Sequence, residues 1–294
     1  MRETTLHAVR LLERAQTGEA AAVQAEAETA LRAVTGDLAD GPACMHFVRV
    51  VSFIARGDQR AAIEAAGPML RAAEREGSRG WQAAALASRA WQRLRLSAPT
   101  ADPAGPRDAD HDTDEVLRDL VAAEMLADGE PDPVAAVNSR VAVAIGWYEL
   151  RLYELVEPQF QSAYEMSSAD GAQNGNRAMW LLNLAEMHLR WALELYQIHR
   201  VAEAESHSAE AERYANRAAA EVSGADAASW RDNALLYAAC SRADRHDRPA
   251  PRWTSSDTPG GCATAVSRPT HSRSAGRSTR WRCPAPGVPP RLSR

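Results

Sequence analysis

Up to about Ala243, apolar residues recur along the chain at intervals of three and four positions, with polar residues between them. Such spacing puts the apolar side chains on one face of an α-helix, and the dominant residues of this segment (alanine, leucine, glutamate and arginine) are strong helix formers. The two-residue alternation of a strand is not sustained anywhere in it. The pattern predicts an all-α body with helices at 3–16, 19–34, 43–55, 59–76, 80–97, 113–127, 133–151, 154–168, 174–199, 202–221 and 227–243.

Segments that contain glycine or proline separate the predicted helices and mark turns. The longest runs from Ser97 to Asp112 and holds three prolines, one glycine and several aspartates, which is typical of an exposed loop. We therefore predict an N-terminal helical group at 1–97, an acidic, proline-containing loop at 98–112 and a C-terminal helical group at 113–247. Because the other connections are short, we expect antiparallel neighbours that stack as helical hairpins.

The order of small and bulky residues in several hairpins resembles the tetratricopeptide (TPR) repeat, in which small residues let two helices approach and larger ones fill the groove between them. The clearest hairpin has these residues at Ala144, Trp147, Val156, Phe160 and Ala163. The turns of the TPR-like hairpins lie at Gly18, Gly57, Arg151 and His199, at unequal intervals, whereas a regular array repeats about every 34 residues. We predict stacked antiparallel hairpins that form a degenerate TPR-like α-solenoid, and a generic helical bundle is the alternative.

The charged residues exclude several classes of function. All 34 basic residues are arginine, so chemistry that needs a lysine amine, such as a P-loop lysine or a Schiff base, is excluded. The net charge of −5 is unevenly divided, because residues 251–294 hold eight arginines and one acid, Asp257. The remaining body is strongly acidic and repels nucleic acid and anionic membrane surfaces, so we expect neither as its partner.

Targeting and cysteine patterns point to the cytoplasm. The chain starts with a charged amphipathic segment, and no uncharged apolar run approaches the roughly 20 residues of a membrane span. The four cysteines form neither a CxxC pair nor a Cys/His cluster with zinc spacing; they are Cys44, Cys240, Cys262 and Cys283. We therefore expect a cytoplasmic protein with reduced cysteines and no membrane partner.

The composition changes abruptly after Pro249. Residues 251–294 are mostly Arg, Pro, Ser, Thr, Ala and Gly, with too few aliphatic side chains for a core, so we predict a disordered tail at 248–294. An arginine-rich arm with Trp253 and Trp281 that binds nucleic acid is one interpretation. We favour the other, out-of-frame translation of a GC-rich sequence, because another frame over 252–265 permits an amphipathic helix. The original C-terminal domain would then be missing, and the exposed apolar face of the helix at 227–243 would cause self-association.

Two groups of residues have spacings that invite a metal-site interpretation. Asp108 to Glu115 resembles the opening of a calcium loop, but Thr113 stands where the turn needs glycine and Asp119 where the bidentate glutamate belongs. We interpret it as an acidic loop that caps the next helix. A helix–turn–helix can place two of three histidines on one face (His188, His199 and His207). Because no carboxylate has HExxH spacing, we expect them half-buried at helix contacts.

The other candidate residues fit packing or solvation better than chemistry. We expect core filling from the helical tryptophans Trp81, Trp91, Trp147, Trp180 and Trp191. The paired carboxylates Glu203/Glu205 and Glu210/Glu212 are expected on a solvated helix face. The sequence holds no GxSxG elbow, no GxGxxG after a strand and no Ser/His/Asp or Cys/His set. We assign no catalytic, cofactor-binding or metal-binding residue, we expect no cofactor, and we predict that the chain is not an enzyme.

One stretch carries a likeness to a known family. Residues 176–195, NRAMWLLNLAEMHLRWALEL, together with Phe47–Gly57 and Gly77–Ala90, resemble the N-terminal TPR-like region of actinobacterial GGDEF-domain proteins, the diguanylate cyclases. The likeness covers most of residues 1–247. It implies that the helical region is a sensory or interaction module, and that a C-terminal GGDEF domain condenses two GTP molecules into cyclic di-GMP. The GG(D/E)EF signature itself is absent, since Gly260-Gly261 is followed by Cys262.

These observations lead to three functional hypotheses. The first is a non-catalytic sensory or protein-interaction module of a cyclic di-GMP signalling protein, truncated before its GGDEF domain, whose partner is a protein, a peptide or its own missing output domain. The alternative is a TPR-like regulatory module of a transcription regulator. An enzyme with an unrecognised site is the third.

Overall fold

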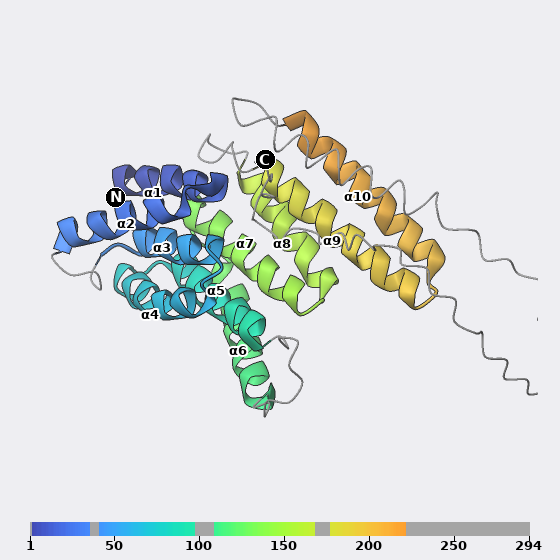
Figure 1. Cartoon of the computed structure of the whole chain (residues 1–294), viewed down its shortest axis with the longest axis horizontal. Helices are drawn as coiled ribbons and strands as arrows, with labels where there is room; N and C mark the ends of the chain where they lie inside the picture. Colours follow the sequence, from blue (N-terminus) through green and yellow to red (C-terminus); the bar gives the residue numbers. More distant parts are fainter. Residues whose placement is uncertain (1, 36–40, 98–108, 168–176, 222–294) are drawn as a thin grey trace, which may run out of the picture.

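The computed structural model describes residues 2–35, 41–97, 109–167 and 177–221, and every regular element in these ranges is helical (Figure 1). The predicted all-α class is confirmed for this part of the chain. The predicted helix at 227–243, its self-association and the tail at 248–294 fall outside the described residues. The helices are α1 (Arg2–Arg14), α2 (Ala20–Thr35), α3 (Ala43–Ala55), α4 (Gln59–Glu76), α5 (Arg79–Ser97), α6 (Ala109–Ala127), α7 (Pro133–Glu149), α8 (Tyr153–Met166), α9 (Arg177–Gln197) and α10 (Val201–Glu221).

Helix boundaries agree with the prediction where the sequence carries a local capping signal. α3 and α4 begin and end at the predicted residues. At the start of α4 the Asp58 carboxylate accepts a hydrogen bond from the Ala61 amide at 3.1 Å, which satisfies a backbone donor that has no partner inside the helix. At its end, Gly77 adopts a left-handed φ of 68°, a conformation that glycine reaches without a steric penalty.

Most other boundaries differ from the prediction by one to three residues, and two larger differences have a physical cause. α1 and α2 are joined by a π-helical segment, Ala15–Glu19, with a kink at Gly18 (φ 104°), where the sequence predicted a turn between separate helices. α6 begins at Ala109 rather than at 113, so the last four residues of the predicted loop, 109–112, are helical, and its other residues fall outside the described ranges. The acid-rich sequence at the start of α6 favours this extension, because the positive end of the helix dipole stabilises negative charge.

Three hairpins (α3–α4, α7–α8 and α9–α10) close through three-residue turns of one common geometry. The middle residue has a positive φ in each, 75° at Gly57, 62° at Arg151 and 61° at His199. The amide of the next residue donates a hydrogen bond of 3.0 Å to the carbonyl five residues earlier, which is the Schellman arrangement. These are three of the four turn positions that the TPR-like spacing identified, and the fourth, Gly18, is a kink instead. Short turns of this kind make the paired helices antiparallel.

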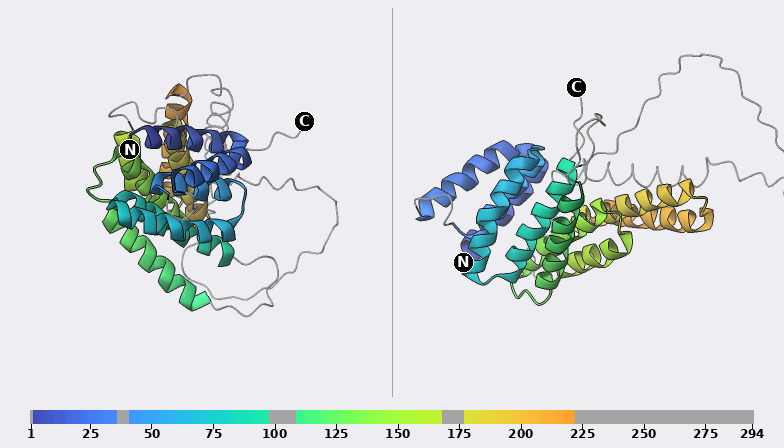
Figure 2. Two further views of the ribbon diagram at one scale, coloured as in Figure 1. Left: turned by 90° about the vertical axis from the view of Figure 1, so that its left-hand side faces the viewer. Right: turned by 90° about the horizontal axis from the view of Figure 1, so that it is seen from below.

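The hairpins stack in chain order from α1 to α10 (Figures 1 and 2). α5 packs against α4, α6 and α7, so the pair α5–α6 links its neighbours on both sides. One cluster of buried apolar side chains extends from α1 to α10. The TPR-like residues of α7 and α8 belong to it, since Ala144, Val156, Phe160 and Ala163 are all buried. The prediction of stacked helical hairpins is therefore confirmed for the described residues.

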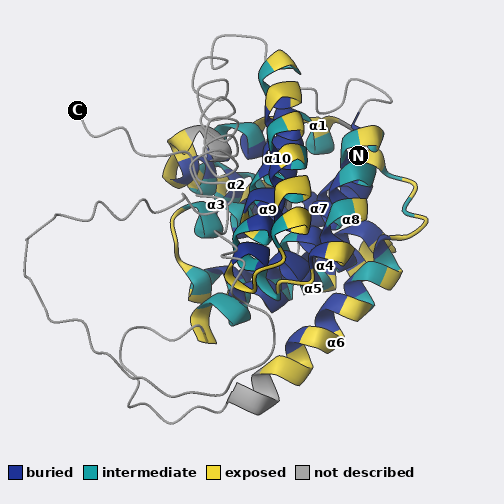
Figure 3. Ribbon diagram, turned by 90° about the vertical axis from the view of Figure 1, so that its right-hand side faces the viewer, coloured by how far each residue is buried: buried dark blue, intermediate teal, exposed yellow. Residues whose placement is uncertain are grey.

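Small residues let the helices approach one another closely. A Cβ atom added to Gly80 of α5 would lie 2.9 Å from the Cβ of Ala135 on α7, and one added to Gly146 of α7 would overlap the Leu120 side chain of α6. Figure 3 shows that buried residues dominate α7 and α9, whereas exposed residues are frequent on α6 and on the outer side of α10. Among the helices of the described ranges, none is both long enough and apolar enough to span a membrane.

Candidate functional site

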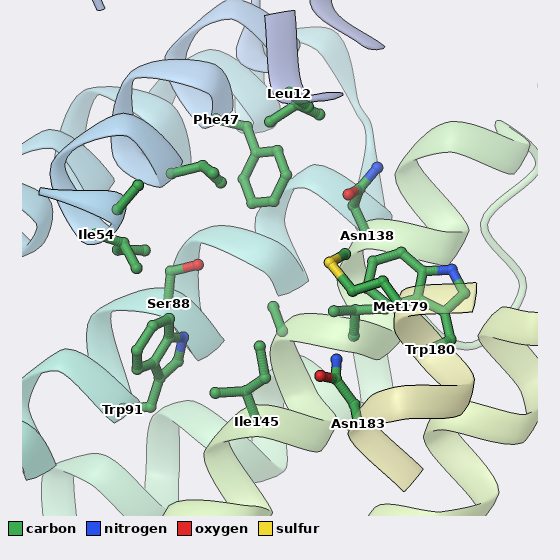
Figure 4. Close-up of a pocket in the computed structure, with 14 residues that line it drawn as sticks. Leu12, Phe47, Ile54, Ser88, Trp91, Asn138, Ile145, Met179, Trp180 and Asn183 are labelled. Carbon is green, nitrogen blue, oxygen red and sulfur yellow. The ribbon is translucent and has the colours of Figure 1, made fainter. Parts of the chain in front are cut away.

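A cavity of about 100 Å³ lies where α1 meets the first helices of the four hairpins α3–α4, α5–α6, α7–α8 and α9–α10 (Figure 4). We call it the first-helix cavity. Because it draws on five helices, it depends on the stacking of all the hairpins. Its lining residues are Leu12 of α1, Phe47, Val51, Ile54 and Ala55 of α3, Ser88 and Trp91 of α5, Asn138, Val141, Ala142 and Ile145 of α7, and Met179, Trp180 and Asn183 of α9.

Helical periodicity explains why these side chains converge. On α3, Phe47, Val51 and Ile54 follow one another at steps of four and three residues, so they lie on one face of the helix. Ser88 and Trp91 are three residues apart on α5 and share a face in the same way. Each helix therefore directs one stripe of side chains toward the cavity.

The lining has a buried floor and a partly exposed mouth. Phe47, Trp91 and Trp180 are 6%, 4% and 2% exposed, so aromatic rings make up much of the floor. Ile54 and Ile145 are of intermediate exposure and border the mouth. A smaller hollow shares Ile145 and Asn183 with the cavity and adds Tyr148, Phe160 and Glu186 to the same face.

The cavity is neutral, with a few polar groups on its wall. None of its lining residues is ionisable. The Nε1 donor of Trp91 is buried and has no hydrogen-bond partner among the described residues. The Ser88 hydroxyl is directed toward the interior of the cavity in Figure 4, and the Asn183 amide lies on the opposite wall. Asn138 uses its Nδ2 atom to donate a hydrogen bond of 2.8 Å to the Val134 carbonyl of its own helix. Such a lining favours an apolar group that carries one polar atom.

A second cluster, of histidine, tyrosine and tryptophan rings, lies between α8, α9 and α10. His188 and His207 approach with their Nδ1 atoms 3.0 Å apart, and His188 is 1% exposed. The Trp191 and His207 rings stack with centroids 3.9 Å apart. We call this cluster the histidine layer; it consists of Tyr153, His188, Trp191, His207 and Tyr214.

The surroundings of the histidine layer lower the pKa of His207. Burial lowers the pKa of His207, and charge on the neighbouring His188 lowers it further. Interaction with the His188 ring lowers the pKa of the Glu157 carboxyl, whose Oε1 atom lies 3.5 Å from Nε2 of that ring. The Tyr214 hydroxyl also donates a hydrogen bond of 3.1 Å to Glu157. One imidazole can thus donate a hydrogen bond to the other, and the arrangement joins α9 to α10.

The structure places the sequence-predicted candidates as follows. It brings two of the three histidines together, His188 and His207, at a helix contact as expected. His207 is half-buried as predicted, but His188 is fully buried and His199 is exposed in the α9–α10 turn. Asp119, which stands at the bidentate-glutamate position of the calcium-loop pattern, lies on α6 and pairs with Arg89, which donates one hydrogen bond of 2.8 Å to each carboxylate oxygen. Of the carboxylates predicted on a solvated face of α10, Glu203 and Glu205 are exposed as predicted, whereas Glu210 and Glu212 are only partly exposed. Within the described residues, no three His, Cys, Asp or Glu side chains cluster as metal ligands would.

Tryptophan packing was predicted correctly, but the cavity was not. Trp81, Trp91, Trp147 and Trp180 are all buried in the helix stack, and Trp191 is partly buried in the histidine layer. Sequence reasoning missed that Trp91 and Trp180 also border a cavity. The one available signal was Ser88, a hydroxyl-bearing residue one turn from Trp91 on an otherwise apolar face. Cys44 is a buried free thiol, and burial raises its pKa to about 12.

Comparisons with known proteins give no family for the chain. It matches no protein-family model, and no curated protein is significantly similar to it. The resemblance to the TPR-like region of GGDEF-domain proteins therefore stays a prediction.

Proposed function

We propose that this chain is a non-catalytic interaction module that binds a partner segment on the face formed by α3, α5, α7 and α9. The observation that supports the proposal is the first-helix cavity, in which side chains from α1 and from all four hairpins surround one partly open space. Hairpin stacks of this type present extended surfaces for peptides and helices. A cavity of about 100 Å³ suits one bulky side chain of such a segment.

The neutral, apolar lining determines the kind of segment that would bind. A charged side chain would lose its hydration here without gaining a charged partner, which is energetically costly. A bulky apolar side chain would instead gain from the removal of its surface from water, roughly 25 cal/mol for each Å². The adjoining hollow with Tyr148 and Phe160 would take part of the segment next to that anchor.

A peptide selection tests this proposal. A displayed library of random 16-residue peptides is selected against the full chain, and the enriched peptides are then measured against two variants. Ile145→Arg introduces a charge at the cavity mouth, and Leu155→Arg introduces the same charge at an exposed position of α8 (40% exposed) outside the lining. We expect Ile145→Arg to abolish binding and Leu155→Arg to leave it unchanged. Peptides that bind both variants like the original chain would contradict the proposal.

The signalling context is a finer part of the same proposal. The resemblance of residues 176–195 to diguanylate cyclases supports a module of a cyclic di-GMP signalling protein, whose partner segment belongs to the output domain or to another protein. The alternative is a module of a transcription regulator. Nucleotide sequencing across codons 245–255 and downstream distinguishes them, because another reading frame should encode a GGDEF domain in the first case and a helix-turn-helix in the second.

A further inference from the structure

The Trp91 indole gives the first-helix cavity an unused hydrogen-bond donor. Its Nε1 atom has no partner among the described residues, although the side chain is only 4% exposed. The Arg95 guanidinium lies over the Trp91 ring at 4.7 Å from the centroid and fixes one side of it. A buried donor without a partner is costly, so a ligand that supplies an acceptor at this point gains more than one that does not.

A second polar group stands beside this donor. Ser88 precedes Trp91 by three residues on α5, so the two side chains are neighbours on one helix face. Ser88 is 2% exposed, and its hydroxyl is directed into the cavity in Figure 4. A hydroxyl both donates and accepts. The α5 wall thus offers a donor next to a group that can accept in return.

The size and the remaining walls select an aromatic ring. An engineered cavity of about 150 Å³ binds benzene, so the present space of about 100 Å³ suits at most a single six-membered ring. Phe47, Trp91 and Trp180 supply ring edges and faces for aromatic contacts. A leucine or phenylalanine side chain would leave the Trp91 donor unpaired. A tryptophan side chain is larger and carries only a donor.

We infer that the first-helix cavity takes the phenol ring of a tyrosine side chain on the docking partner, with the tyrosine oxygen at the Ser88–Trp91 wall. This inference rests on the proposed docking function. The phenol oxygen accepts a hydrogen bond from Trp91 Nε1 and donates its own to the Ser88 hydroxyl, while the ring packs against Phe47 and Trp180. The neutral phenol needs no charged partner, in agreement with the uncharged lining.

Small side-chain analogues test the chemistry directly. Ligand-observed NMR titrations of the full chain compare p-cresol, the analogue of tyrosine, with toluene, the analogue of phenylalanine. Loss of one buried hydrogen bond corresponds to about a threefold to tenfold change in affinity. We expect p-cresol to bind that much more tightly than toluene. We also expect Trp91→Phe, which keeps a ring but removes the donor, to reduce the preference for p-cresol over toluene, because only the Ser88 hydroxyl then remains to bind the phenol oxygen.

Two further variants and a peptide pair complete the experiment. Ile145→Trp blocks the mouth and should abolish p-cresol binding, whereas Leu155→Trp on α8 should not; far-ultraviolet circular dichroism confirms that each variant is folded. An exposed tyrosine peptide should bind at least threefold more tightly than the same peptide with phenylalanine. Equal binding of p-cresol and toluene, p-cresol binding that survives Ile145→Trp, or p-cresol binding without any tyrosine-peptide preference would each overturn the inference. If selected peptides bind through leucine and are lost in Ile145→Arg, the docking function holds and only the tyrosine assignment fails.

Discussion

Acidification should destabilise the fold through one buried side chain, His46 of α3. The ring is fully buried. Burial lowers its pKa from the ordinary value of 6.5 to about 4, and the positive charges of Arg49, Arg75 and Arg71 act in the same direction. The backbone at Gly41 opposes this effect weakly. At neutral pH the ring is therefore largely uncharged in both the folded and the unfolded chain, so its protonation contributes little to the free energy of unfolding.

The sign and size of the effect follow from linkage. Between pH 6.5 and about 4 the unfolded chain binds a proton at His46 that the folded chain does not, so the free energy of unfolding falls as the pH falls. The difference between a pKa of 6.5 and one of about 4 corresponds to about 3 kcal/mol in the free energy of unfolding. At pH 5 the protein should have lost about 2 kcal/mol of this stability. A loss of this size is large beside the 5–15 kcal/mol that is typical of whole domains.

Urea unfolding of the full chain at pH 7.5 and pH 5, followed by circular dichroism at 222 nm, measures this loss. The His46→Leu variant has no titrating group at this position, so it should lose about 2 kcal/mol less stability than the original chain between the two pH values. The other histidines and the carboxylates are common to both proteins and cancel in the comparison. An equal pH dependence of the two proteins would refute the burial of a neutral His46.

Two further substitutions test the packing and the turns. His199→Gly should raise the free energy of unfolding by about 1 kcal/mol, because His199 is exposed and holds a left-handed φ of 61° that glycine adopts without strain; a loss of stability in urea unfolding would contradict the turn geometry. Gly80→Val should lower the free energy of unfolding by about 2 kcal/mol, because the new Cβ atom would lie 2.9 Å from the Cβ and 3.0 Å from the carbonyl carbon of Ala135. Gly67→Val on α4 is the matched control and should cost much less, because the nearest atom to an added Cβ at this position is 3.7 Å away. Equal losses of stability in both variants would argue against close contact between α5 and α7.

Local signals explain how much of the fold could be predicted from the sequence. α4 was predicted to the residue because Asp58 caps one end of it and Gly77 ends it, and both act within a few residues of chain. The turns at Arg151 and His199 were found through the spacing of their hairpins, although neither residue is a glycine. The join between α1 and α2 was missed, because Gly18 usually indicates a turn and here permits a kink within continuous helix.

The candidate site depends on contacts that no local pattern encodes. The spacing of Trp81 and Trp91 on α5 predicted burial for both, but only the position of α7 and α9 relative to α5 leaves space beside Trp91. Likewise, the spacing of the histidines indicated that two of the three share a face but not which two, and the approach of Glu157 from α8 to His188 depends on how the two hairpins stack. Helix periodicity gives the face of each residue but not the distance between faces.

The central claim, that the first helices of the hairpins converge on one ligand-accepting cavity, can be tested by intermolecular nuclear Overhauser effects. The full chain is labelled at the methyl groups of isoleucine and methionine, and p-cresol is added. We expect contacts from the p-cresol ring to Ile145 of α7 and Met179 of α9, which line the cavity from different helices. Contacts only to the exposed Ile198 and Met125, or to no methyl group at all, would contradict it.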